Sequence, residues 1–208
     1  MLICKTRCEA VGSTILTWKL GYANQKARIQ TAEQKGGKIV GLRFDQRVPG
    51  FVYVLRSLDP TWYNRIKVGL SVDPIERSRQ LYTTGVPFPF VPYYAWAVTD
   101  MAYAERIAHV VLDDHRLMNS REHFDVIPVH RRMVCLDRLE PPTMDEVMCC
   151  LDTLLELIEI EYECSKLLGH YSVDVEQLND YSRQRKRTAK DPNNPNAYGP
   201  LFYSPPQY

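Results

Sequence analysis

The sequence predicts an α+β fold in which a small three-stranded antiparallel sheet is flanked by helices. Two short runs rich in aromatic and β-branched residues, 51–55 and 66–70, indicate neighbouring strands joined by a long hairpin loop. A third run, 90–98, indicates another strand and follows a segment with a helix-start signature. The central part of the chain therefore has the order strand, strand, helix, strand, helix.

The helices of this central part are predicted from their ends and their periodicity. Asp73, Pro74 and Glu76 are typical of a helix N-terminus, because Asp caps free backbone N–H groups and Pro fits the first position. Apolar residues at helical spacing predict a second helix from Ala102 to about Arg116. A short amphipathic helix is expected near 129–139.

Composition divides the chain into four segments. We expect a basic N-terminal extension over 1–46, the central domain over 47–132, an acidic helical extension over 133–180, and a disordered basic, Pro- and Tyr-rich tail over 181–208. Thr143 and Glu146 have the spacing of a capping box and precede a long amphipathic helix, predicted over 144–168. The apolar stripe of that helix either packs on its own domain or offers a surface for a homodimer or protein partner.

The net charge of +1 results from cancellation between these segments. In chain order they carry net charges of +5, +2, −10 and +4. This excludes a uniformly basic nucleic-acid binder, but the basic ends would add phosphate contacts. The acidic helix could instead hold the basic tail and block a DNA surface.

The sequence gives no sign of a membrane or secreted protein. No run reaches the roughly 20 apolar residues that span a bilayer, so we expect no membrane partner. The six cysteines include no CxxC pair, which favours a cytoplasmic location. The histidines at 109, 115, 123 and 130 lack the compact spacing of a zinc site.

Polar residues occupy special points of the predicted elements. Tyr53 lies mid-strand, Lys67 interrupts an apolar strand, and Arg77 lies in the first turns of the following helix. Glu105 and His109 are four residues apart and share one helix face.

These residues resemble the signature of the GIY-YIG nuclease superfamily. Phe51-Val52-Tyr53 and Lys67-Val68-Gly69 occupy the positions of its two motifs, with Arg77 and Glu105 at the family's spacing. The closest likeness is to the phage and bacterial branch with lysine in the second motif, because an E-x3-H helix and the run Arg121-Glu122-His123-Phe124 also occur. Neither motif is literal, and the second tyrosine is Lys67.

The resemblance implies an endonuclease that hydrolyses DNA with Mg²⁺ or Mn²⁺, in a bacterial or phage-infected cell. Glu105 would bind the metal, since Mg²⁺ is commonly held by one or two carboxylates and several waters. Tyr53, Lys67, Arg77, His109 and Glu122 would be catalytic. Arg77 would stabilise the phosphate, and Lys67 would lower the pKa of Tyr53 so that Tyr53 activates water. The alternative is a catalytically inactive DNA-binding or protein-interaction module on the same fold.

Overall fold

The chain forms two compact units. A computed structural model describes residues 47–82, 88–118, 122–165 and 169–188. One unit combines 1–46 with 127–142, and the other combines 47–126 with 143–208. The basic N-terminal extension and the tail beyond residue 188 lie outside the described residues.

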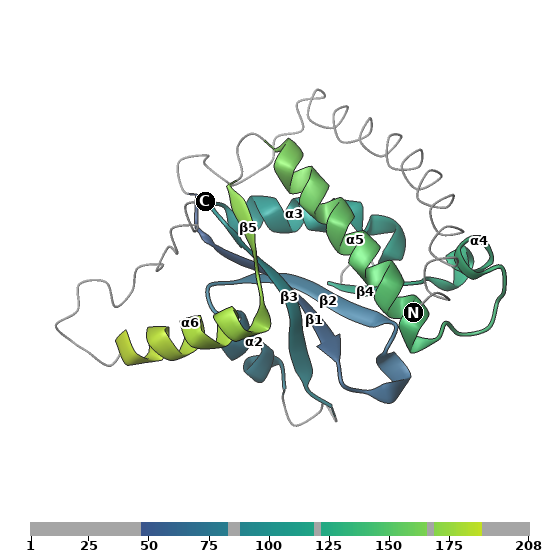
Figure 1. Cartoon of the computed structure of the whole chain (residues 1–208), viewed down its shortest axis with the longest axis horizontal. Helices are drawn as coiled ribbons and strands as arrows, with labels where there is room; N and C mark the ends of the chain where they lie inside the picture. Colours follow the sequence, from purple (N-terminus) through teal and green to yellow (C-terminus); the bar gives the residue numbers. More distant parts are fainter. Residues whose placement is uncertain (1–46, 83–87, 119–121, 166–168, 189–208) are drawn as a thin grey trace, which may run out of the picture. The chain divides into compact units, whose positions relative to one another are not determined.

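A five-stranded antiparallel sheet forms the centre of the second unit (Figure 1). Its strand order is β4-β2-β1-β3-β5. The strands are β1 (Gly50–Ser57), β2 (Arg65–Ser71), β3 (Phe90–Val98), β4 (His123–Asp125) and β5 (His170–Val173). The first three confirm the predicted strands, but the prediction of a three-stranded sheet was wrong. The two added edge strands have only 3 and 4 residues, which is too short for an alternating pattern to show.

Helices α2 (Pro74–Leu81) and α6 (Val175–Thr188) cover one face of this sheet (Figure 1). Alternate residues of β1, among them Phe51, Tyr53 and Leu55, form a buried cluster there with Leu178 and Tyr181 of α6. The rings of Phe51 and Tyr181 meet edge to face with their centroids 5.0 Å apart. Apolar burial therefore fixes α6 to the sheet.

Helices α3 (Met101–Val111) and α5 (Met144–Cys164) cover the opposite face (Figure 1). The Tyr162 ring of α5 lies 5.4 Å from that of Trp96 in β3, and its hydroxyl donates to the carbonyl oxygen of Ala104 at 3.0 Å. The capping box of Thr143 and Glu146 is confirmed. The apolar stripe of α5 is buried within the chain's own domain. Among the described residues, no helix is long and apolar enough to cross a bilayer.

The start of the C-terminal tail differs from the prediction. Disorder was expected from Tyr181 onward, yet α6 continues to Thr188. The composition of this helix is polar, but Leu178, Tyr181 and Ser182 are buried and hold it on the domain. Within the described part of the tail, Lys186 pairs with Glu76 of α2 at 2.7 Å, so this lysine is held by α2 and not by the acidic helix.

The described part of the first unit is short. It contains a 3-10 turn, η3 (Val129–Arg131), followed by α4 (Arg132–Leu136). These confirm a helical segment near 129–139, although it ends early at Asp137, whose φ of 53° is left-handed.

Candidate active site

Tyr53 and Gly69 form the closest contact of the candidate site. Tyr53 of β1 is 1% exposed and lies opposite Gly69 of β2. A Cβ atom at residue 69 would come within 2.7 Å of the Tyr53 Oη atom and 3.0 Å of its Cζ atom. The tyrosine ring therefore occupies the space that any other side chain at residue 69 would need. Gly69 was expected only as part of the second motif, and a glycine inside an apolar strand is the feature of the sequence that indicates such a close contact.

Arg77 is the cation that faces the Tyr53 hydroxyl. Asp73 caps α2 by accepting the Glu76 N–H at 3.0 Å, which sets Arg77 in the first turns of that helix. Burial raises the pKa of Tyr53, while a hydrogen bond and the positive charge of Arg77 partly oppose the rise.

Lys67 has a different position and partner from those expected. It lies opposite Leu55, two residues from the Tyr53–Gly69 pair, whereas we expected an offset of about one. The expectation that Lys67 lowers the pKa of Tyr53 was wrong. The pKa is raised by burial, and the positive charge that opposes this rise belongs to Arg77.

Lys67 instead forms an ion pair with Glu122. Its Nζ atom lies 2.6 Å from Glu122 Oε2, and Lys67 is 7% exposed. The hydrogen bond and charge of Lys67 lower the pKa of Glu122, although partial burial opposes them. Glu122 directly precedes β4, and its backbone oxygen accepts the Val68 N–H at 3.1 Å. The pair therefore stands where β4 joins β2.

Glu105 and His109 of α3 both reach the part of β2 that lies beyond the end of β4. His109 Nε2 lies 3.2 Å from the Val68 carbonyl oxygen, and the Glu105 carboxylate accepts the Leu70 N–H. Because Glu105 and His109 are four residues apart on one helix face, their side chains reach two backbone groups on the same edge of β2, the Leu70 N–H and the Val68 carbonyl. Both side chains thus satisfy groups that would otherwise lack a sheet partner.

The electrostatics of these residues are linked. Burial raises the pKa of Glu105, and the negative charge of Glu122 raises it further, while Lys67 opposes both. Burial lowers the pKa of His109. Since a carbonyl oxygen only accepts, His109 Nε2 must carry hydrogen, which leaves Nδ1 with a lone pair when the ring is neutral. The structure therefore brings all six predicted site residues into one electrostatic neighbourhood.

Two carboxylates contribute to this cluster, which limits the metal chemistry it offers. No group of three or more His, Cys, Asp or Glu side chains suited to a metal occurs among the described residues. His115, a member of the histidine-rich stretch, directs Nδ1 at the carbonyl oxygens of Asp125 and Val126, at 3.0 and 3.1 Å. His115 therefore stabilises the backbone at the end of β4.

A domain-family model matches the central segment of the chain. Residues 50–140 match the T5orf172 domain family, whose fold is GIY-YIG-like and nuclease-associated. No curated protein and no solved structure matched the chain. The match includes all six predicted site residues and ends before α5, so β5 and α6 are additions to the matched segment.

Proposed function

We propose that this chain is a divalent-metal-dependent endonuclease that hydrolyses phosphodiester bonds of DNA. The observation that carries the proposal is the convergence of Tyr53, Arg77 and the Lys67–Glu122 pair with Glu105 at the edge of β2, within the T5orf172 match. Phosphodiester hydrolysis needs an oriented water, stabilisation of phosphate charge and a destination for a proton. This cluster offers a group for each requirement.

The donor set suits Mg²⁺ or Mn²⁺. Both ions favour carboxylate oxygens, and Mg²⁺ is commonly held by one or two carboxylates, waters and substrate phosphates. The raised pKa of Glu105 reflects a carboxylate that is partly buried near the like charge of Glu122, and a bound cation would relieve that repulsion. Glu105 would hold the metal. The negative charge of Glu122, which acts on Glu105, would also attract the ion. When bound, the ion would lower the pKa of its water and offset phosphate charge.

Arg77 and Tyr53 would bind and orient the reacting groups. Arg77 is exposed, so its planar guanidinium can reach phosphate oxygens while it contacts Tyr53. Because the pKa of Tyr53 is raised, its hydroxyl stays protonated near neutral pH. Since Arg77 donates to the Tyr53 oxygen, the hydroxyl hydrogen of Tyr53 is left to orient the water or a phosphate oxygen.

His109 would receive the proton from the attacking water. Its lowered pKa keeps the imidazole neutral near pH 7, and the contact with Val68 leaves the lone pair on Nδ1. Lys67 and Glu122 would hold β4 against β2 and set the charge around Glu105.

Cleavage of plasmid and linear DNA tests the proposal. Cutting should require Mg²⁺ or Mn²⁺ and stop with EDTA, and Tyr53→Phe, Arg77→Ala and Glu105→Gln should each lower the rate by about 10²-fold or more. Arg79→Ala is the matched control, because Arg79 is an exposed arginine on the same helix that pairs only loosely with Glu76 at 3.5 Å. Folded variants that still cut like the wild type would reject this assignment.

A catalytically inactive DNA-binding module is the second candidate. It is favoured by the backbone contacts of Glu105 and His109, which give both residues a structural reason to be present. DNA binding without metal-dependent cutting, in protein whose fold is intact, would support this candidate.

A further inference from the structure

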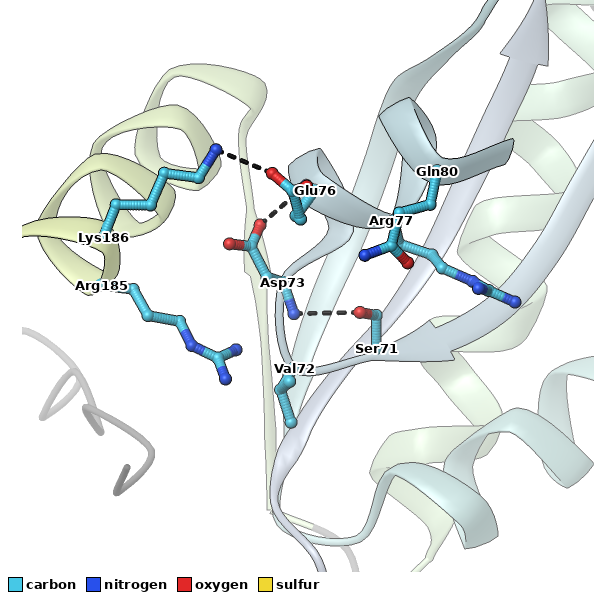
Figure 2. A pocket seen from close by; sticks show the side chains of 8 residues that line it. All are labelled: Ser71, Val72, Asp73, Glu76, Arg77, Gln80, Arg185 and Lys186. Carbon is cyan, nitrogen blue, oxygen red and sulfur yellow. Dashed lines mark hydrogen bonds and ion pairs between the residues drawn. The ribbon is translucent and has the colours of Figure 1, made fainter. Parts of the chain in front are cut away.

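An open pocket of about 360 Å³ lies between α2 and α6, next to the candidate active site. Figure 2 shows residues from β2, α2 and α6 around it. They are Ser71, Val72, Asp73, Glu76, Arg77, Gln80, Arg185 and Lys186. Arg77 borders this pocket and also contacts Tyr53, so the pocket adjoins the place proposed for the scissile phosphate.

The position of α6 beside this pocket is fixed by its packing. Leu178 is fully buried and Tyr181 is 6% exposed. The Ser182 hydroxyl donates to Asp73 Oδ2 at 2.9 Å, and Asp73 is also the N-cap of α2. These contacts place the next turn of α6, with Arg185 and Lys186, beside the first turn of α2.

Some charged side chains of the pocket have a partner within the pocket, and Arg185 differs from them. Lys186 Nζ lies 2.7 Å from Glu76 Oε2, and this pairing lowers the pKa of Glu76. Asp73 is occupied by the Glu76 N–H and the Ser182 hydroxyl. Figure 2 shows the Arg185 guanidinium reaching toward Val72 and Asp73. The ion pairs of α6 within the described residues involve Arg183 and Lys186, not Arg185. Arg185 therefore presents a planar donor group to the pocket.

We propose that α6 adds a second phosphate-binding site to the proposed nuclease, in which Arg185 and Lys186 hold a DNA backbone phosphate adjacent to the one at Arg77. The inference rests on the proposed function for the identity of the ligand. An incoming phosphate contacts Arg185 and competes with Glu76 for Lys186, while the Ser71 hydroxyl and the Gln80 amide offer further hydrogen bonds. The added site positions the strand without reading its sequence.

The location of this site explains how a chain with a net charge of +1 can hold DNA. Acidic charge is concentrated on the α5 side of the sheet, whereas α6 brings its basic residues to the α2 side, where Arg77 lies. Since α6 lies beyond residues 50–140, this phosphate contact is an addition of this chain to the matched segment.

Equilibrium binding of a short labelled duplex in EDTA tests the site without cleavage. The variant Arg185→Ala/Lys186→Ala should bind more weakly than the wild type, and the slope of log affinity against log salt should fall in magnitude by about 0.9, the value for one neutralised phosphate. The matched control is Arg183→Ala/Arg187→Ala, which removes two charges from the same helix outside the pocket. Equal losses in the two double variants would overturn the proposal.

Glu76→Gln supplies a readout that misfolding cannot imitate. Removing this carboxylate releases Lys186 from its partner, so duplex affinity should rise, and the rise should vanish when Lys186→Ala is added. Unchanged or weaker binding by Glu76→Gln would contradict the proposed competition.

The two proposals fail in distinguishable ways. If the wild type binds but does not cut with Mg²⁺, while the pocket variants lose affinity, the phosphate site stands and the nuclease does not. If the wild type cuts but the pocket variants bind like the wild type, the nuclease stands and the site is rejected. A wild type that does not bind the duplex overturns the site.

Discussion

The contact between Tyr53 and Gly69 explains why a glycine interrupts β2. Glycine in a strand loses backbone entropy and packs no side chain, so its presence usually marks a close approach. Here the approaching group is the Tyr53 ring, whose hydroxyl would lie 2.7 Å from an added Cβ atom. Gly69 thereby sets the position of the hydroxyl relative to Arg77.

Gly69→Ala should displace the Tyr53 ring and damage the candidate site. The ring lies in a filled core, so we expect a loss of about 1–3 kcal/mol in the free energy of unfolding, measured by urea denaturation. Metal-dependent cutting should fall to the level of Tyr53→Phe. In the double variant Gly69→Ala/Tyr53→Phe, the two losses of activity should not add, because both substitutions act through the Tyr53 hydroxyl. Additive losses would mean that Gly69 acts by another route.

The two acidic residues of the site should affect stability in opposite directions as pH changes. The folded pKa of Glu122 is lowered, so its contribution is present above its unfolded pKa of about 4.5 and is lost as the pH falls. The folded pKa of Glu105 is raised, so its ionised form opposes folding once the pH exceeds the unfolded value.

Substitution by glutamine should expose this difference. At pH 7, Glu122→Gln should cost about 1 kcal/mol, because solvent screens a pair whose glutamate side chain is 47% exposed, and the cost should shrink by pH 3. Glu105→Gln should gain stability relative to wild type between pH 4 and pH 7, since the amide oxygen can still accept the Leu70 N–H. Denaturation series at these pH values check both signs, and parallel trends would contradict the assigned causes.

At the scale of elements, sequence reasoning succeeded where local chemistry defines an end. Asp73 and Pro74 start α2, Thr143 and Glu146 start α5, and both caps are present. It failed for β4, β5 and α6, which depend on distant partners. Leu178 and Tyr181 acquire a buried surface only when the sheet exists, and the polar sequence around them indicates disorder when read alone.

The candidate site shows the same division. The residue types, and the spacing that resembles the GIY-YIG signature, predict Tyr53, Arg77 and Glu105 as site residues, because each lies at a definable point of an element. The pairing of Lys67 with Glu122 could not be predicted, because it depends on how β4 meets β2 across 55 residues of sequence. The contact between His109 and the Val68 carbonyl oxygen could not be predicted either, because it depends on how α3 packs beside the edge of β2.

At the scale of the molecule, each face of the sheet is covered in part by a helix that lies outside the matched segment. Residues 50–140 contain the candidate site but end before α5 and α6. The α5 helix buries Leu151, Leu154 and Tyr162 on one side, and α6 buries Leu178 and Tyr181 on the other. The segment that contains the candidate site therefore depends on the rest of the chain for its core.

Truncation tests this dependence. A chain that ends at residue 140 should lose cooperative thermal unfolding and bind a hydrophobic dye, since removal of α5 and α6 leaves apolar surface on both faces of the sheet exposed to water. A chain that ends at residue 188 is the matched control, because it keeps every described helix and strand, and it should unfold in a single transition. Circular dichroism with heating, together with dye fluorescence, measures both properties. A sharp transition in the chain that ends at 140 would show that the matched segment folds without its helical covers.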